Sequence, residues 1–302
     1  MGTRLADRTT GMATYEVHGV DLIVRANDPA VMARVEDTYG WFASDGPRNG
    51  DPRRTVEVAL VRDTQGGTTI VDADGRTSRW RDEDEPLVGL FDAIVGGLIA
   101  ALAQTGVLAI HSGVVSVDGR AVVVAGRSGR GKTTLVLGLL RRGLDLLSDE
   151  LALIAQDDRT VLPYPRGLHL RRQALDLFPE LGFLADIPPF ALGGGSEWAV
   201  GPTALEGAFG TRIAPSARLS AVVLLEGEPD GDAAPDPSPV PGAVATMELL
   251  RGTPAAAWDF DGALGRLPRV VADVPCIRLR SARLDETVDA VLAILAGPGA
   301  VR

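Results

Sequence analysis

The first part of the chain is organised in short apolar runs that alternate with polar residues or are rich in β-branched side chains. Such runs cover Tyr15 to Val24, Thr55 to Val61 and Thr68 to Val71. A period of two is typical of strands that bury one face. The pair Asp74-Gly75 is a turn signal after the third run. The pattern predicts a small β-rich or α+β region over residues 1–85.

A long apolar run follows from Leu87 to Ala103 and is interrupted by the charged residue Asp92. Its large side chains share a helical spacing: Leu87, Leu90, Phe91, Ile94, Val95, Leu98, Ile99 and Leu102. The run is short compared with the roughly 20 residues of a membrane span, and it carries a charge in its interior. The pattern therefore predicts a helix that is buried against a sheet, and no membrane segment.

The next pattern is a buried strand, a glycine-rich loop and a helix. Ala121 to Ala125 is a continuous, β-branched apolar run, as in strands that are buried on both faces of a parallel sheet. After Lys132 the apolar residues return at helical spacing, and Gly143 marks the end of the helix. This order is typical of α/β proteins. We expect an α/β catalytic domain over residues 86–302.

The remainder of the chain mixes loops with a few clear elements. We expect strands at Leu144 to Glu150 and Ala221 to Leu225, and a terminal helix at Leu284 to Leu295. Two stretches rich in glycine or in proline and aspartate are expected to be mobile: Gly193 to Gly195 and Glu228 to Gly242. The first is a candidate lid, and the second is expected to be a surface loop.

Charge and cysteine content narrow the class of protein. The formal charge of -10 argues against a nucleic-acid partner and against a basic membrane-surface helix, because both need a positive surface. Cys276 is the one cysteine, so the chain cannot form an internal disulfide. The N-terminus carries Arg4, Asp7 and Arg8 and has no apolar signal core. These features predict a cytoplasmic enzyme with no nucleic-acid and no membrane partner.

The segment Gly126 to Thr133 is a complete G-x-x-x-x-G-K-[ST] phosphate-binding loop. Lys132 is the only lysine of the chain, and it occupies the position whose ammonium reaches the β- and γ-phosphates of a nucleotide. The Thr133 hydroxyl is the expected Mg²⁺ ligand. The residues expected to bind nucleotide are Gly126, Ser128, Gly129, Arg130, Gly131, Lys132, Thr133 and Thr134. The loop predicts that the chain binds a nucleoside triphosphate.

A pair of carboxylates, Asp149 and Glu150, ends the strand that follows the loop helix, and Asp149 comes 17 residues after Lys132. Most proteins with this loop place the Mg²⁺-binding acid on a more distant strand, so the spacing is restrictive. Guanine-specific switches need an Asn-Lys-x-Asp element, which is excluded because the last asparagine is Asn49. The spacing favours a kinase.

Three segments of the chain resemble the HPr serine kinase/phosphorylases, which share their loop arrangement with phosphoenolpyruvate carboxykinases. These segments are Ile110 to Val114, Gly126 to Thr133 and Ser148 to Glu150, and the spacing between them is similar as well. A weaker likeness covers Ile213 to Leu225. The resemblance implies an α/β fold with the kinase core of this type, ATP and Mg²⁺ as cofactors, and a homo-oligomer.

The resemblance also implies roles for individual residues. His111 would lie beside the transferring phosphate, Asp149 would be the general base that accepts the proton of the acceptor hydroxyl, and Glu150 would hold Mg²⁺ with Thr133. With Lys132, these residues form the expected catalytic set. The family usually has two aspartates where this chain has Asp149 and Glu150, and the region before residue 100 is unlike the usual regulatory domain.

These departures make the chain more similar to the diverged kinases of bacterial peptide-modification gene clusters. The expected acceptor is therefore a serine of a peptide or small protein, such as a ribosomally made precursor peptide. Two alternatives remain: a kinase for an amino acid or another small metabolite, and a non-catalytic regulator that binds nucleotide.

Several basic residues outside the loop are candidates for contacts with phosphate or with the acceptor. They are His169, Arg171, Arg212 and Arg218. Arginines near a transferring phosphoryl group stabilise its developing charge. The other reading is that they belong to solvated faces of the molecule.

Overall fold

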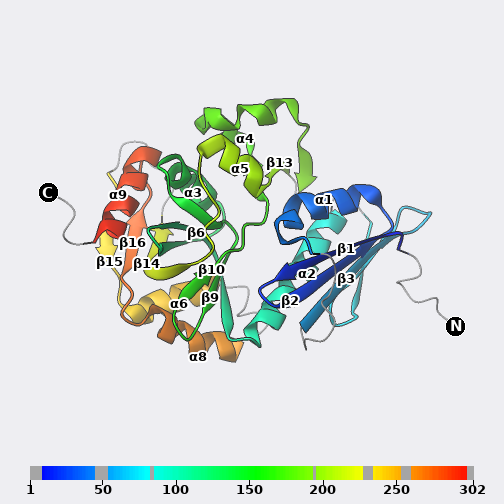
Figure 1. Cartoon of the computed structure of the whole chain (residues 1–302), viewed down its shortest axis with the longest axis horizontal. Coiled ribbons are helices and arrows are strands. Elements are labelled where there is room, and N and C mark those ends of the chain that lie inside the picture. The colour runs from blue at the N-terminus through cyan, green and yellow to red at the C-terminus, as the bar shows by residue number, and fades with distance from the viewer. Residues whose placement is uncertain are drawn as a thin grey trace. The chain divides into compact units, whose positions relative to one another are not determined.

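The computed structural model describes residues 9–44, 54–81, 85–192, 195–226, 234–252 and 260–297. The chain divides into two compact units (Figure 1). The first unit combines Met1–Gln104 with Arg166–Gly201, and the second combines Thr105–Pro165 with Pro202–Arg302. Each unit has a main β-sheet of its own, and the chain is of the mixed α/β class.

This division differs from the expected boundary between residues 85 and 86. Helix α2 (Glu85–Ala103) belongs to the first unit, where it packs on the sheet so closely that a Cβ on Gly97 would lie 2.6 Å from Val56 Cγ1. The segment Arg166–Gly201 also belongs to the first unit, although the sequence places it inside the expected catalytic domain. The apolar stripe of a helix shows that it is buried, but the stripe does not show which sheet buries it.

The first unit contains a five-stranded sheet with the order β1-β2-β3-β4-β5. Its strands are β1 (Gly11–Val17), β2 (Val20–Ala26), β3 (Arg54–Arg62), β4 (Thr68–Val71) and β5 (Thr77–Trp80). The expected run from Tyr15 to Val24 is split into two strands, because His18 and Gly19 adopt φ values of 49° and 83° and form a tight hairpin turn. The run at β3 and the turn at Gly75, with φ 77°, are confirmed.

Two helices pack on this sheet: α1 (Pro29–Tyr39), which continues into the 3₁₀ turn η2 (Gly40–Phe42), and α2. The Asp28 side chain caps α1 by accepting from Ala30 N at 2.8 Å. Within the described residues, Pro86–Ala103 of α2 is long and apolar enough to cross a bilayer by length and composition, and 56% of that window is buried in the fold. The predicted packing of this helix on a sheet is confirmed.

The first unit also contains a three-stranded sheet in the order β11-β13-β12. Its strands are β11 (Leu168–Arg171), β12 (Phe190–Leu192) and β13 (Gly195–Val200). Helix α4 (Arg172–Leu177) and the 3₁₀ helix η3 (Pro179–Asp186) lie between β11 and β12 in the sequence. Gly193 and Gly194 of the expected mobile lid lie outside the described residues. On either side of them Leu192 pairs with Gly195, so the flanks form a hairpin of paired strands.

The second unit is built on an eight-stranded sheet with the order β10-β9-β6-β7-β14-β16-β15, and β8 pairs with β6. Its strands are β6 (Val107–Val117), β7 (Arg120–Ala125), β8 (Asp145–Ser148), β9 (Leu151–Ala155), β10 (Thr160–Leu162), β14 (Ala217–Glu226), β15 (Pro237–Pro239) and β16 (Cys276–Arg280). β14 is parallel to both β7 and β16, whereas β6 is antiparallel to β7. The sheet is therefore mixed. Strand β15 lies in the stretch that was expected to be a loop from Glu228 to Gly242, of which residues 228–233 are not described.

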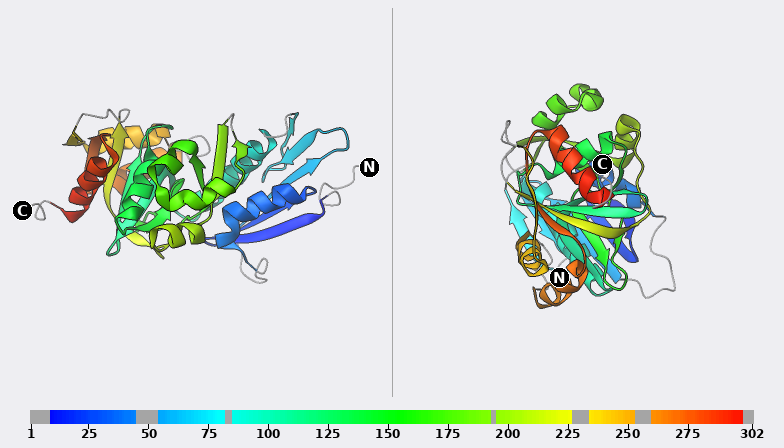
Figure 2. Two further views of the ribbon diagram at one scale, coloured as in Figure 1. Left: turned by 90° about the horizontal axis from the view of Figure 1, so that it is seen from above. Right: turned by 90° about the vertical axis from the view of Figure 1, so that its left-hand side faces the viewer.

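Helices cover both faces of this sheet. α3 (Lys132–Arg141) and α9 (Leu284–Ala296) pack together on one face, while α6 (Gly242–Gly252) and α8 (Phe260–Val271) lie on the other (Figure 2). Helix α5 (Pro202–Phe209) precedes β14. Val123 of β7 belongs to the same buried cluster as Leu249 of α6 and Leu267 of α8. The sheet is thus buried on both sides, which explains the continuous apolar sequence of β7.

Candidate functional site

The glycine-rich loop joins the end of β7 to the start of α3, as the sequence predicts. Gly129 and Gly131 have φ values of 78° and 83°, in the left-handed region that other residues rarely adopt. Gly126 lies against β14, and a Cβ at that position would be 2.8 Å from the Leu225 carbonyl oxygen. The glycines therefore allow a tight turn of backbone at the N-terminus of α3, where N–H groups favour an anion.

Lys132 is the first residue of α3, and its side chain is folded over the loop. Its Nζ donates hydrogen bonds to the carbonyl oxygens of Gly126 at 2.9 Å and Arg127 at 3.4 Å. The residue is 8% exposed, and this burial lowers the pKa of the ammonium against the opposing influence of Asp149 and Glu150. A buried ammonium held by carbonyls of the loop fits the group that binds the phosphates of a nucleotide.

The helix after the loop is joined to the carboxylates after β8 by a hydrogen bond. Thr133 Oγ1 donates to Asp149 Oδ2 at 2.8 Å. The other carboxylate oxygen, Oδ1, is buried beside Gly113 of β6, where a Cβ would lie 3.5 Å from it. The predicted proximity of the loop threonine and the carboxylate pair is thus present in the structure. The family resemblance implies that Thr133 and Glu150 hold Mg²⁺ together, whereas the hydrogen bond joins Thr133 to Asp149.

Gly113 is a positioning residue that the sequence reasoning missed as an individual. A Cβ on Gly113 would lie 2.5 Å from Val136 Cγ2 of α3, which is far closer than a van der Waals contact. The glycine allows α3 and the Asp149 carboxylate to approach β6. A glycine in the interior of a β-branched strand is the signal that could have found it, since such glycines often mark a close approach of another element.

We predict that Gly113→Ala lowers the free energy of unfolding by about 1–3 kcal/mol, because Val136 is buried and its β-branched side chain has little freedom to move. Urea denaturation measures this loss. The matched variant is Val136→Ala, which removes the atom that clashes. The double variant should lose less free energy of unfolding than the sum of the losses in the two single variants. Strictly additive losses would contradict the close packing as the cause.

The carboxylate pair forms the connection between the end of β8 and the start of β9, and both of these strands pair with β6. His111 pairs with Leu151, Val114 pairs with Ser148, and Ser112 N donates to Glu150 O at 3.1 Å. This pairing along β6 therefore brings the segment around His111 against the segment around Glu150. The three segments that carry the family resemblance meet in one place of the second unit.

Ser148 holds the turn that carries the two carboxylates. Its hydroxyl is fully buried and accepts hydrogen bonds from the backbone N–H groups of Glu150 at 3.1 Å and Leu151 at 3.0 Å. A serine oxygen that accepts from backbone groups two and three residues later fixes a local turn. The sequence reasoning did not single out this serine.

His111 faces the second carboxylate. Its Nδ1 lies 3.1 Å from the Glu150 carbonyl oxygen and 3.8 Å from Glu150 Oε1. Because a carbonyl oxygen only accepts, the first contact assigns a proton to Nδ1. The side chains of His111 and Glu150 are 31% and 32% exposed, so both are accessible from solvent.

The two candidate arginines of the second unit, Arg212 and Arg218, lie at strand ends away from the loop. Arg218 at the start of β14 pairs with Arg120 at the start of β7, whereas the loop leaves the other end of β7, about 20 Å away for six residues of strand. Arg212 forms a 3.3 Å ion pair with Asp145 at the start of β8 and is 82% exposed. A contact of Arg212 or Arg218 with the transferring phosphate or the acceptor stays a prediction, because spacing along the sequence does not say at which end of a sheet a side chain lies.

His169 and Arg171 belong to the other unit, on β11. Glu197 of β13 accepts from Arg171 Nε at 3.2 Å, and its Oε2 lies 3.6 Å from His169 Nδ1. The His169 ring also stacks edge-on against Phe91 with a centroid distance of 6.2 Å. These contacts account for both residues within their own unit, and a role toward phosphate or acceptor stays a prediction.

The residues at the loop fit a nucleotide with Mg²⁺. In the described part of the chain, no group of three or more His, Cys, Asp or Glu side chains is arranged to hold a metal ion. Mg²⁺ needs no such group, because it usually takes one or two protein oxygens and completes its shell with water and phosphate. The Thr133 hydroxyl and the Asp149 carboxylate, 2.8 Å apart, are oxygen donors of the right kind.

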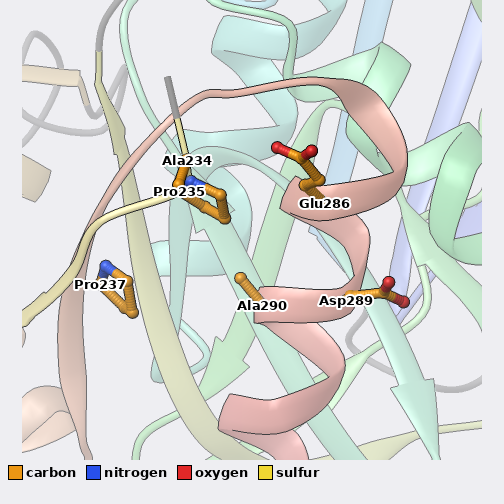
Figure 3. Close-up of a pocket in the computed structure, with 6 residues that line it drawn as sticks. All are labelled: Ala234, Pro235, Pro237, Glu286, Asp289 and Ala290. Carbon is orange, nitrogen blue, oxygen red and sulfur yellow. The ribbon is translucent and has the colours of Figure 1, made fainter. Parts of the chain in front are cut away.

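A surface groove lies elsewhere on the second unit (Figure 3). The residues that line it come from the start of α9 and from the segment around β15: Ala234, Pro235, Pro237, Glu286, Asp289 and Ala290. Asp289 forms a 2.7 Å ion pair with Arg142, the residue after α3. An acidic and proline-lined groove lacks the donors that a phosphate needs, so the loop remains the candidate site.

No family model matches the chain, and no curated protein matches it in sequence. Among solved structures, the HPr(Ser) kinase/phosphatase from Coxiella burnetii is similar to this chain. The match has 13% sequence identity and a TM-score of 0.30, and it covers 61% of this chain and 95% of that chain. It is a distant structural likeness, and we carry neither substrate nor site residues over from it.

Proposed function

We propose that the chain is an ATP-dependent kinase that transfers the γ-phosphoryl group to a hydroxyl. One observation carries the proposal: the hydrogen bond from Thr133 Oγ1 to Asp149 Oδ2. This bond joins a complete phosphate-binding loop, with its buried Lys132, to the carboxylates that follow β8. Loop, lysine and acid are the parts that phosphoryl transfer uses to position phosphates and to neutralise charge. In this proposal the second unit is a kinase core of the HPr kinase/phosphoenolpyruvate carboxykinase type.

The chain's own groups would bind the triphosphate. Backbone N–H groups between Gly126 and Thr133 would hold phosphate oxygens, and Lys132 would move from the loop carbonyls to the β- and γ-phosphates. Thr133 and one carboxylate of the pair would hold Mg²⁺, which neutralises charge on the phosphates when it is bound. Because the transition state is loose, positioning and charge make up most of the catalysis.

A carboxylate next to the loop supports transfer to an alcohol, since a hydroxyl must lose its proton as the new bond forms. The resemblance assigns this base to Asp149 and the metal to Glu150. The accessible pair of His111 and Glu150 provides groups that an acceptor can reach, which a regulator that only binds nucleotide does not require. A carboxylate acceptor would be repelled here, so a serine hydroxyl of a peptide is the acceptor that we favour.

The kinase proposal includes a cytoplasmic location and a homo-oligomer, both from the family resemblance and the composition. The runner-up is a kinase for a free hydroxyl metabolite or amino acid, because the same base would serve it. A non-catalytic nucleotide-binding regulator is the third possibility. The acceptor distinguishes these three.

Mass spectrometry with Mg-ATP tests the acceptor. We expect a serine-containing peptide encoded beside this chain to gain the mass of one phosphate, and a Ser→Ala version of that peptide to gain none. Free serine and other small alcohols in parallel reactions serve as the comparison. Phosphorylation of a small molecule without any peptide product would contradict the peptide acceptor and support the small-molecule kinase.

A further inference from the structure

The neighbouring carboxylates Asp149 and Glu150 contact different partners, although they follow each other in the sequence. We infer that Asp149 serves the metal side of the site and that Glu150, held beside His111, accepts the proton of the acceptor hydroxyl. This assignment is the reverse of the one that the family resemblance implies. It rests on the proposed kinase function, because it divides the work of that same site.

Asp149 is half-buried, with one oxygen buried and the other hydrogen-bonded to the loop threonine. Oδ2 accepts from Thr133 Oγ1 at 2.8 Å, and Oδ1 is buried next to Gly113 and α3. In phosphate-loop enzymes, the hydroxyl of the loop and a neighbouring aspartate hold Mg²⁺ together. A carboxylate bound to that hydroxyl is thus in the right place to bind or orient the ion. An acceptor would meet these oxygens less readily than those of Glu150, because a base needs an oxygen within about 3 Å of the atom that carries the proton.

Glu150 has an accessible side chain on a fixed backbone. The side chain is 32% exposed, and its Oε1 lies 3.8 Å from His111 Nδ1. Its N–H is bound by Ser148 Oγ at 3.1 Å, and its carbonyl oxygen accepts from Ser112 N and from His111 Nδ1, both at 3.1 Å. Three hydrogen bonds therefore fix the backbone of Glu150 on both sides. A catalytic group of this kind can be reached and is still held in one place.

His111 is then a positioning residue for Glu150. Its Nδ1–H is directed at the carbonyl oxygen and lies near the carboxylate, so it limits the directions in which the Glu150 side chain can turn. A histidine that orients a neighbouring carboxylate differs from one that contacts phosphate, as the resemblance implies for His111.

The proposed step balances without a further reactant. The acceptor oxygen forms a bond to the γ-phosphorus while its proton passes to a Glu150 carboxylate oxygen. The bond between the γ-phosphorus and the β,γ-bridging oxygen breaks, and its electron pair stays on the departing ADP. Lys132, whose Nζ donates to the loop carbonyl of Gly126, would move from there to the phosphates and neutralise the charge that develops on them.

Two isosteric variants separate the roles, with calorimetry and transfer assays as independent measurements. Glu150→Gln cannot take a proton, so transfer at saturating Mg²⁺ should fall roughly 10²- to 10⁴-fold. At every Mg²⁺ concentration, the affinity of this variant for ATP should stay within about twofold of the wild-type affinity, because only the chemical step is affected. Asp149→Asn should lower the Mg²⁺-dependent affinity for ATP roughly 10- to 100-fold and regain much of its transfer rate at high Mg²⁺.

Asp145→Asn is the matched control, because Asp145 lies on β8 and pairs with exposed Arg212 at the other end of that strand. It should leave both measurements unchanged. Far-UV circular dichroism confirms that each variant is folded. The inference is overturned if Asp149→Asn abolishes transfer with intact Mg-ATP affinity, or if both variants show the same loss. A wild-type chain that binds Mg-ATP but transfers nothing to any acceptor overturns the kinase proposal instead.

Discussion

Substitution of Lys132 by alanine is expected to remove ATP turnover and to weaken triphosphate binding strongly, while the chain stays folded. Lys132 is the only lysine in the protein, and its ammonium lies over the loop at 2.9 Å from the Gly126 carbonyl oxygen. Charge-assisted hydrogen bonds contribute about 1.5–3 kcal/mol each. Loss of one donor aimed at the transition state costs roughly 10²- to 10³-fold in kcat.

Two variants make this test specific. Lys132→Arg keeps the charge, but its planar head does not fit the same carbonyl cage, so it should restore little turnover. Arg142→Ala removes a positive charge from the residue just after α3, where it pairs with Asp289, and should bind Mg-ATP like the wild type. Calorimetry with Mg-ATP measures all three. Unchanged affinity in folded Lys132→Ala would refute the loop as the nucleotide site.

We expect the same lysine to lower the free energy of unfolding of the nucleotide-free protein. Burial lowers the pKa of Lys132, so the folded state binds this proton less tightly than the unfolded state. The ammonium therefore destabilises the fold at neutral pH, and the cost fades as pH rises above its folded pKa. We expect Lys132→Met to unfold at no lower urea concentration than the wild type at pH 7, which would mark Lys132 as a functional residue.

Substitution of Thr133 by valine is the second prediction with a large effect. Valine keeps the shape and removes the hydroxyl that donates to Asp149 Oδ2, so both a metal ligand and the orientation of that carboxylate are lost. The Mg²⁺ concentration for half-maximal transfer should rise roughly 10- to 100-fold. Steady-state rates measured across a Mg²⁺ titration give this value.

Thr133→Ser provides the control, since it retains the hydroxyl and loses only a methyl group. It should keep the Mg²⁺ dependence of the wild type within a few-fold. If the valine and serine variants behave alike, the hydroxyl has no part in metal binding, and the hydrogen bond to Asp149 serves only the packing of α3.

The sequence was sufficient for the parts of the site that are close along the chain. The strand before Gly126, the helix that begins at Lys132 and the acid-tipped strand β8 lie within about 30 residues, where spacing limits the possible arrangements. The resemblance placed His111 and Glu150 in one site but did not predict a contact between them. The structure brings them together through the pairing of β6 with β8 and β9.

The features that could not be predicted from the sequence depend on the order and direction of the strands. Arg218 precedes an apolar strand as a phosphate ligand could, but β14 is parallel to β7, so its start lies at the end opposite the loop. Helix α2 could have covered either sheet, and the segment Arg166–Gly201 returns to the first unit. Such choices are set by long-range packing, which leaves no local signal in the pattern of residues.

The most direct test of the kinase proposal follows the fate of the γ-phosphate of Mg-ATP by ³¹P NMR, with and without a serine peptide. We predict that the γ-signal disappears only when acceptor is present, that ADP and a phosphoester signal appear in equal amounts, and that Lys132→Ala produces neither. ATP that stays intact with every acceptor, or that yields only inorganic phosphate at a rate independent of the acceptor, would contradict the assignment of this chain as a kinase.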